Sequence, residues 1–207
     1  MEKLILVDPN LGVCEAWYSY FDGLPDVKIV NLPFERLPEF DCMVSAANSH
    51  GLMDGGVDAA ITRFFGEQLM QRVQARILDE YLGEQPIGTS MIIETTHEKH
   101  PFIAHTPTMR IPQDIRHTDH VYSAMWAMLL AVRQHNRTSE RKIRIVACPG
   151  LGTLTGRVPF AEAARKMALA YKNYLDPMTY ISWGHVTARQ KHIRFGDFLG
   201  FRTPMDE

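Results

Sequence analysis

Cysteine is scarce in this chain. Its 207 residues include three cysteines, Cys14, Cys42 and Cys148, which are too few and too scattered for a disulfide framework or a four-thiolate zinc site. Each lies in or after an apolar segment, which is typical of a reduced, buried thiol. Long apolar runs are also missing, because stretches such as 124–132 are far shorter than the roughly 20 residues that a membrane-spanning helix needs. The first residues lack the apolar core of a signal peptide, so we expect a cytoplasmic protein with no membrane partner.

An excess of charge of either sign is missing as well. Lys and Arg number 22 and Asp and Glu number 24, which gives a formal net charge of -2. This balance argues against nucleic acid or an anionic membrane as the main partner. Hydrophobic residues make up 45% of the chain, which excludes a disordered protein. No repeat, linker or low-complexity tract divides the sequence, so residues 1–207 are predicted to form a single domain.

Short apolar runs alternate with amphipathic stretches along the chain. Strands are predicted over residues 3–7, 27–31, 41–46, 90–94, 101–105, 143–147 and 179–186. Helices are predicted over residues 13–21, over one long stretch from Ile61 to Ile77 that Gly83 ends, over 118–134, and from Pro159 to Leu175. No periodicity is evident beyond Arg189. The alternation predicts an α/β protein with three layers around a mixed, largely parallel central sheet.

Two glycine-rich loops, at residues 51–56 and 149–156, each join a predicted strand to a predicted helix. Glycine lets backbone N–H groups approach a ligand closely, and a helix N-terminus adds the positive end of its dipole. Two such loops at the ends of neighbouring strands would form a cleft suited to a diphosphate. Neither loop matches a P-loop or a Gly-x-Gly-x-x-Gly fingerprint.

Two polar residues flank the first loop. Asn48 follows a strand, where its amide could bind sugar hydroxyls, and Asp58 opens a helix, where its carboxylate could orient or deprotonate a water molecule. Each also has a purely structural interpretation. Asp58 suits the positive end of a helix, and Asn48 suits a turn. The residues alone leave both interpretations open.

Two longer motifs resemble those of a known family. The segment Asp41-Cys-Met-Val-Ser-Ala-Ala-Asn48, followed by Met53-Asp-Gly-Gly-Val-Asp58-Ala-Ala-Ile61, resembles the first signature of the macro domain family. That signature usually reads Asp-x-Ile-Val-Asn-Ala-Ala-Asn, then a glycine-rich stretch, then Gly-Val-Asp-x-x-Ile. Residues 147–159 are similar to the family's second phosphate loop, including the proline that opens the next helix. The resemblance covers residues 27–174, with 1–26 as an additional strand and helix and 187–207 as a C-terminal extension, and it fits a divergent bacterial or phage-type member.

The resemblance implies a macro-like fold that binds ADP-ribose or an ADP-ribosylated protein, with the diphosphate between the two loops. In the hydrolytic branch of the family, the residues that match Asn48 and Asp58 act on the substrate. This match implies that Asn48 positions the distal ribose and that Asp58 activates or orients water, or orients the ribose itself. That branch releases ADP-ribose from modified proteins, acetyl groups from O-acetyl-ADP-ribose or, in some members, a phosphate from ADP-ribose 1″-phosphate. Most of the family needs no metal, and no cofactor is expected. The residues that the resemblance assigns to the ligand are Phe34, Glu35, Ala47, Asn48, Gly55, Gly56, Val57, Gly150, Leu151, Gly152, Thr153, Leu154, Thr155, Gly156 and Arg157.

Several residues depart from the family pattern. Ser45 replaces the first Asn of the signature, Asp54 adds a negative charge beside the expected diphosphate, and Leu154 stands where Gly is common. Near Phe34 and Glu35 the family's adenine-binding Asp is missing, and Glu35 is the candidate to replace it. Three functions therefore stay open: an ADP-ribosyl hydrolase or deacetylase, a non-catalytic ADP-ribose reader, and a domain that binds another nucleotide or an RNA end.

Histidine is abundant, with nine residues, but no metal site is predicted. His97 and His100 lie three apart in a polar turn, and no Cys or group of carboxylates completes a set of ligands around them. The oligomeric state cannot be predicted from these patterns.

Overall fold

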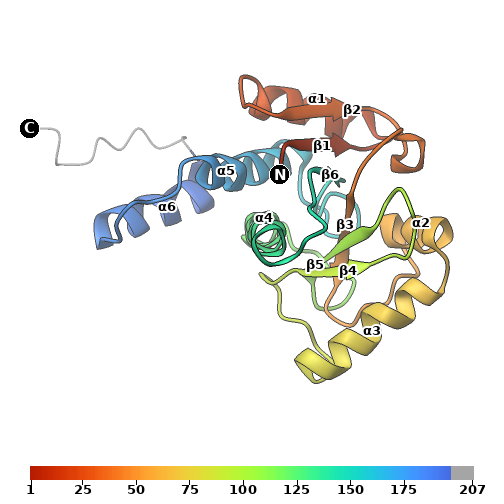
Figure 1. The fold of residues 1–207 in the computed structure, drawn as a ribbon. Coiled ribbons are helices and arrows are strands. Elements are labelled where there is room, and N and C mark those ends of the chain that lie inside the picture. The colour runs from red at the N-terminus through yellow and green to blue at the C-terminus, as the bar shows by residue number, and fades with distance from the viewer. Residues whose placement is uncertain (197–207) are drawn as a thin grey trace, which may run out of the picture.

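The structure is a computed structural model that describes residues 1–196, and a six-stranded sheet forms its centre (Figure 1). In spatial order the strands are β2 (Val27–Val30), β1 (Lys3–Val7), β6 (Ile145–Cys148), β3 (Cys42–Asn48), β5 (Phe102–Met109) and β4 (Met91–Glu94). All neighbouring pairs are parallel except β4 and β5, which are antiparallel. Five parallel strands therefore end at one edge, where an open α/β sheet usually binds its ligand.

Helices cover both faces of the sheet, so the predicted three-layer α/β fold is confirmed (Figure 1). One face packs against α1 (Leu11–Phe21), α4 (His120–Thr138) and α5 (Phe160–Leu175), and the other against α2 (Gly56–Phe65) and α3 (Gln68–Tyr81). A short 3-10 helix, η1 (Phe34–Arg36), follows β2, and α6 (Trp183–Phe195) packs on α5.

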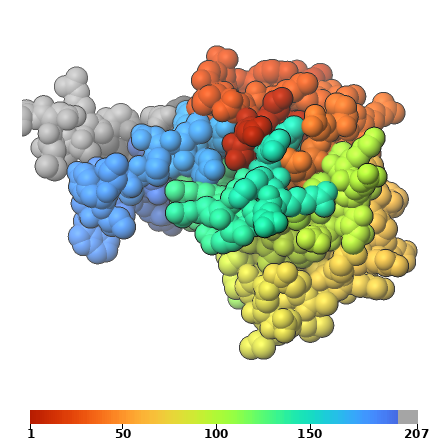
Figure 2. Space-filling model, in the orientation of Figure 1, coloured from red at the N-terminus to blue at the C-terminus, as the bar shows by residue number. Residues whose placement is uncertain are grey.

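The N-terminal strand lies inside the sheet and not at its edge. β1 separates β2 from β6 and pairs with both along its length. Its sequence is almost uniformly apolar, with Leu4 and Leu6 fully buried on one face and Ile5 and Val7 nearly so on the other. Such a run is typical of a parallel strand covered by helices on both faces. In the space-filling view the red N-terminal residues lie against the later part of the chain, where Glu2 N and Lys3 N donate to Arg144 O (Figure 2).

The predicted single long helix after the first loop is wrong, because Gly66 divides it into α2 and α3. Gly66 has a φ of 92°, which an L side chain rarely adopts, and its N–H closes the last turn of α2 on Thr62 O. The apolar residues on both sides of the break face the same layer, with Ile61 from α2 and Leu69 from α3 fully buried in one cluster. Their spacing of about four residues runs through the break, which is why periodicity alone suggests one helix.

The predicted strand over residues 179–186 is also wrong. The chain from Trp183 onward forms α6, and the side chain of Ser182 caps its N-terminus by accepting a hydrogen bond from His185 N. The segment reads as a strand because it is rich in aromatic and branched residues, but Ile181 and Trp183 are 84% and 86% exposed and meet no sheet edge. Residues beyond Arg189, which show no sequence periodicity, continue this helix to Phe195; residues 197–207 lie outside the described part.

The strand β5 is longer than predicted. It continues from the expected end at His105 to Met109, and Pro107 pairs there with Ala47 of β3. Proline is tolerated because β4 pairs only with the first half of β5, up to His105, and leaves that side of Pro107 without a strand. This extension carries Thr108 to the edge where the other parallel strands end.

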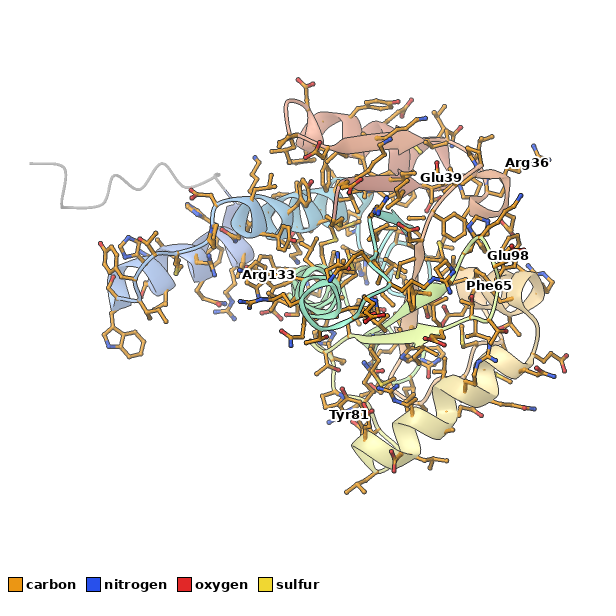
Figure 3. All side chains as sticks on the ribbon, viewed as in Figure 1. Arg36, Glu39, Phe65, Tyr81, Glu98 and Arg133 are labelled. Carbon is orange, nitrogen blue, oxygen red and sulfur yellow. The ribbon has the colours of Figure 1, made fainter. Side chains whose placement is uncertain are left out.

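Charged side chains stand at the periphery of the molecule. Arg36 of η1, Arg133 of α4 and the loop residues Glu39 and Glu98 are all exposed (Figure 3). Within residues 1–196, no helix combines the length and the apolar composition that crossing a bilayer requires.

Candidate functional site

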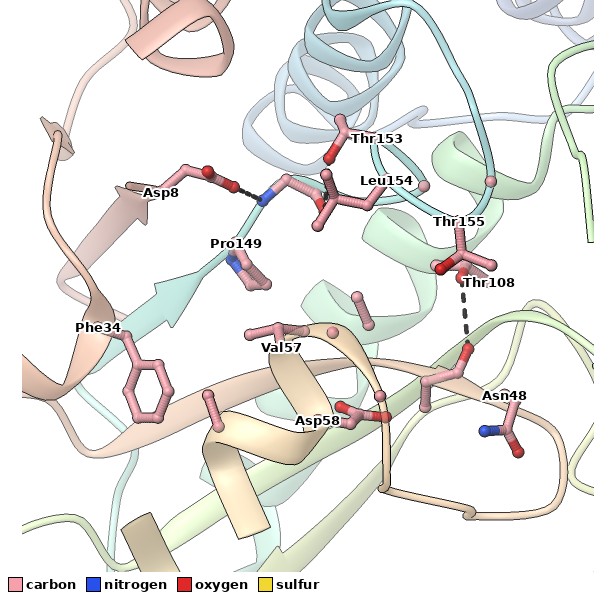
Figure 4. A pocket seen from close by; sticks show the side chains of 18 of the residues that line it. Asp8, Phe34, Asn48, Val57, Asp58, Thr108, Pro149, Thr153, Leu154 and Thr155 are labelled. Atoms are coloured by element: carbon pink, nitrogen blue, oxygen red, sulfur yellow. Dashed lines mark hydrogen bonds between the residues drawn. The ribbon is translucent and has the colours of Figure 1, made fainter. Parts of the chain in front are cut away.

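A cavity of about 460 Å³ opens at the carboxyl edge of the sheet (Figure 4). Residues at or just beyond the ends of β1, β3, β5 and β6 line it, together with η1 and the first turn of α2. Both glycine-bearing loops contribute, so segments about 100 residues apart in the sequence meet around one space. This is the position at which parallel α/β sheets bind ligands.

Asn48 lies at the end of β3, where the register with β5 shifts. Its Nδ2 donates to Leu52 O at 2.7 Å, and its Oδ1 accepts from the backbone N–H groups of His50 and Leu52 at 3.0 and 3.3 Å. The amide therefore holds the first loop in shape, as expected of a turn residue. The second N–H of Nδ2 makes no hydrogen bond within this loop and can still donate to a ligand.

The first turn of α2 faces the cavity without a side chain to cap it. Gly55 is the N-cap residue, and no side-chain hydrogen bond closes this end of the helix. A Cβ added at Gly55 or at Gly56 would meet no atom within 4 Å, so the backbone borders open space at both positions. Gly56 also has a φ of 55°, which favours glycine. The N–H groups of the first helical turn have no intrahelical acceptors, and they are suited to an anion.

Asp58 is buried in the first turn of α2, with 5% of its surface exposed. Its Oδ1 accepts a hydrogen bond of 2.7 Å from Ser45 Oγ, which comes from β3 and is fully buried. Burial raises the pKa of Asp58 to about 7, the Ser45 hydrogen bond opposes the rise, and the charge of Asp54 adds to it. The carboxyl group bonds to a strand residue and not to the helix N-terminus, so it does not act as a helix cap. A carboxyl group that titrates near neutral pH at the wall of a cavity is suited to proton transfer.

The second loop, between β6 and α5, is packed tightly against the protein. A Cβ at Gly156 would lie 2.6 Å from Gly152 O, and one at Gly150 would lie 2.7 Å from Thr153 Oγ1. Gly152 has a φ of 70°, a Cβ there would lie 3.0 Å from Val121 Cγ2, and Gly152 O accepts from Val158 N at 3.0 Å. Here glycine is needed for the loop to close on itself.

Asp8 is a cavity residue that the sequence analysis did not identify. It follows β1 directly, and its carboxylate accepts hydrogen bonds from Gly150 N at 3.2 Å and from Asn10 N at 2.9 Å (Figure 4). Burial raises the pKa of Asp8, and the two backbone hydrogen bonds oppose that rise. The Asp-Pro-Asn sequence reads as a turn, and the available signal was its place at the end of a parallel strand.

Thr108 is a second residue that was missed, because β5 was predicted to end at His105. It is buried, lines the cavity and donates from Oγ1 to Ala47 O at 3.3 Å, which ties the ends of β5 and β3 together (Figure 4).

The structure places most of the predicted site residues in the lining of this cavity. Those in the lining are Phe34, Glu35, Ala47, Asn48, Gly55, Gly56, Val57, Asp58, Gly150, Gly152, Thr153, Leu154, Thr155 and Gly156. Two predicted residues are not part of it. The side chain of Leu151 is fully buried in the core cluster, and Arg157 is exposed beyond the lining with a φ of 55°.

The paired histidines of the β4–β5 turn belong to a ring cluster that adjoins the cavity through Phe34, but neither histidine lines the cavity. His100 stacks on Phe40 at 3.8 Å between ring centroids, and its Nδ1 bonds to Phe40 O. Burial lowers the pKa of His100, which therefore favours the neutral form. Among residues 1–196, no group of three or more His, Cys, Asp or Glu side chains is arranged to hold a metal ion.

Comparison with known proteins gives a consistent result. The protein-family model described as "Macro domain" matches residues 44–167, which is more than half of the chain. A relative from Aquifex aeolicus, named only "Uncharacterized protein", is 31% identical over 142 residues, which are 69% of this chain and 78% of the relative.

Solved structures share the fold. An Oceanobacillus iheyensis macrodomain mutant with ADPR has a TM-score of 0.58 at 20% identity, covering 79% of this chain and 89% of that one. The O. iheyensis macrodomain with ADP has a TM-score of 0.57 at 21% identity, covering 75% and 84%. At these identities the two structures establish the arrangement of the elements.

Proposed function

This chain belongs to the macro domain family, and from that premise we propose that it binds ADP-ribose or a derivative in the cavity and hydrolyses an ADP-ribosyl linkage there. The observation that carries the proposal is the meeting of the two loops around the uncapped N-terminus of α2, with the Asp58 carboxyl group in the wall beside it.

The first turn of α2 supports the binding half of the proposal. Gly55, Gly56 and Val57 offer backbone N–H groups to the cavity, and no side chain competes for them. A diphosphate accepts such bonds and is further stabilised by the positive end of the helix dipole. Solved relatives of this fold contain ADP or ADPR, which agrees with a diphosphate ligand.

Asp58 and Ser45 support the catalytic half. The Ser45 hydrogen bond fixes Oδ1, which leaves Oδ2 of Asp58 to take a proton from a water molecule. The water oxygen forms a bond to the anomeric carbon of the terminal ribose, the bond from that carbon to the modified side chain breaks, and the leaving atom takes up a proton. Because the pKa of Asp58 is about 7, the carboxylate form is populated at neutral pH and remains basic enough for this transfer.

A non-catalytic reader is the second candidate, and the bonds of Asn48 favour it. The amide of Asn48 is largely engaged in holding its own loop, so little of it remains to orient a sugar for reaction. A reader would use the same cavity and the same loops without turnover.

Calorimetry tests the binding half. We expect ADP-ribose to bind more tightly than AMP or NAD, because only ADP-ribose carries both a diphosphate and a free terminal ribose. If AMP or single-stranded RNA binds better than ADP-ribose, the site serves another nucleotide or an RNA end and the proposal fails.

Release of ADP-ribose from a modified protein tests the catalytic half. Asp58→Asn is expected to lower turnover by about 100-fold or more while changing affinity for ADP-ribose by less than about threefold. Asp79→Asn is the matched control, because Asp79 is an exposed residue of α3 outside the lining. Binding without any release of ADP-ribose or acetate by the wild-type protein identifies a reader.

A further inference from the structure

Carboxylates are the charged side chains that line the cavity. Asp8, Glu35, Asp54 and Asp58 belong to the lining, and no Lys, Arg or His from residues 1–196 does. Arg157, which the sequence placed beside the phosphate, is exposed beyond it. An anionic ligand therefore meets backbone N–H groups as its donors and no side-chain cation.

The four carboxylates form two groups at opposite ends. Asp8 and Glu35 follow β1 and β2, while Asp54 and Asp58 follow β3. β6 lies between β1 and β3, so the strands that lead to the two groups are two strand spacings, about 10 Å, apart. Figure 4 shows Asp8 and Asp58 on different sides of the cavity, with Val57 and Pro149 between them.

The middle of the cavity is the part that suits an anion. The backbone N–H groups of Gly55, Gly56 and Val57 border it opposite the second loop, whereas the Asp58 side chain of the same turn is bonded to Ser45 of β3. The ends differ in character, because Phe34 and Pro33 give the β1–β2 end an apolar wall that suits a nucleobase. The site thus provides one central place for negative charge and an acidic surface on each side of it.

We propose that this layout selects ligands by charge: the cavity accepts a nucleotide whose only anionic group is a central diphosphate and rejects one that carries a further phosphate at either end. The inference rests on the proposed function and narrows its substrate class. The substrate is an ADP-ribose derivative with neutral ends, such as a terminal ribose joined to its acceptor through an ester or a glycosidic bond.

The carboxylates disfavour a ligand with a charged phosphate at either end, and they also favour a ligand with neutral ends. Each oxygen of Asp8 accepts one backbone N–H and keeps lone-pair capacity, and Ser45 occupies only Oδ1 of Asp58. Sugar hydroxyls and amino groups can donate to the remaining positions. A phosphate offers mainly acceptor oxygens there. No cationic side chain of the lining offsets the repulsion between that phosphate and the carboxylates.

The test compares three ligands by calorimetry at physiological ionic strength: ADP-ribose, ADP-ribose 1″-phosphate and ADP-ribose 2′-phosphate. Wild-type protein is expected to bind ADP-ribose about tenfold or more tightly than either phosphorylated ligand. Equal or tighter binding of the phosphorylated ligands overturns the inference while leaving the proposed function intact. Failure of all three to bind overturns the proposed function itself.

Two charge-neutralising variants sharpen the comparison. Asp54→Asn is expected to strengthen binding of ADP-ribose 1″-phosphate by about threefold or more. Glu35→Gln is expected to strengthen binding of ADP-ribose 2′-phosphate by a similar factor. Because salt screens charge interactions over distance, each variant should affect the ligand whose extra phosphate lies at the same end of the cavity. Both residues are exposed and have no hydrogen bond that the substitution would break, so the fold is retained. Asp79→Asn on α3 is the control and should leave all three affinities unchanged. If each variant changes both ligands alike, the effect is one of net charge and the inference is wrong.

Discussion

The two loops of the cavity use glycine for opposite reasons. In the first loop, a side chain at Gly55 or Gly56 would project into open space. In the second, a side chain at Gly150 or Gly156 would collide with the loop itself. The first loop is held instead by polar side chains, since Asn48 bonds to three of its backbone atoms and Thr62 Oγ1 donates to Met53 O.

This difference separates two roles that look alike in the sequence. Gly55 and Gly56 leave room for a ligand, whereas Gly150 and Gly156 let the second loop fold back on itself. Gly51, at the start of the first loop, is packed as well, because a Cβ there would lie 2.8 Å from Val73 Cγ1. Substitutions at Gly55 should therefore change binding, and equivalent ones at Gly156 should change stability. The same substitution at two positions tests this directly.

Gly156→Val is expected to have the largest effect, destabilising the protein by about 5 kcal/mol. The new Cβ would lie 2.6 Å from Gly152 O, a backbone atom that cannot move without opening the loop. Chemical denaturation measures the change, and the smaller Gly156→Ala variant, with about 3 kcal/mol expected, covers the case in which the valine variant does not fold. Wild-type stability in both variants would show that the second loop is as open as the first.

Asp58→Asn should alter how stability depends on pH. The pKa of Asp58 is about 7 in the folded protein and near 3.8 when unfolded, so the folded state binds the proton more tightly. The contribution of Asp58 to the free energy of unfolding is fully present below pH 4 and is lost as pH rises through 7, a change on the order of 4 kcal/mol. The Asp58→Asn variant should not show this decrease in stability. Denaturation from pH 4 to 8 checks it. Asp8, with its raised pKa, and His105, whose pKa burial lowers to about 3, contribute equally to both proteins. Parallel stability curves would mean that folding does not raise the pKa of Asp58.

Gly55→Val should leave stability almost unchanged and weaken ADP-ribose binding by about 100-fold, or about 3 kcal/mol. Gly55 has a φ of -135°, which valine adopts readily, and its side chain would occupy the cavity. Gly184→Val on α6, another glycine without a close neighbour, is the matched control for binding. Calorimetry measures the affinity of both variants for ADP-ribose, and thermal unfolding measures their stability. If the folded Gly55→Val variant retains wild-type affinity, the ligand binds elsewhere.

Arg157→Gly should have the smallest effect. Arg157 has a φ of 55°, so glycine would relieve backbone strain and raise stability by about 0.5–1 kcal/mol. Affinity for ADP-ribose should change by less than about threefold, because the side chain lies beyond the cavity lining. If the affinity for ADP-ribose falls by tenfold or more, the Arg157 side chain contacts the phosphate.

Local patterns predicted most of the framework. The strand and helix at residues 3–21, the two loops and the helix opened by Pro159 all follow from short-range features such as apolar runs, glycines and a fixed proline φ. The two wrongly assigned elements, the single long helix and the strand over residues 179–186, have a common cause. The spacing of Ile61, Leu69 and Ile77 reports which face is buried and not whether the helix is continuous, and the apolar residues near Ile181 report strand propensity but not whether a partner strand exists.

Most of the elements, their order and the macro domain motifs can be predicted from the sequence, because periodicity, turn residues and short motifs are local properties of the chain. The geometry of the site depends on tertiary packing. That packing inserted β1 between β2 and β6 and so brought Asp8 to Gly150, buried Asp58 against Ser45, and left Arg157 outside. Burial, pKa and proximity depend on which distant segments pack together, and no local pattern specifies that packing.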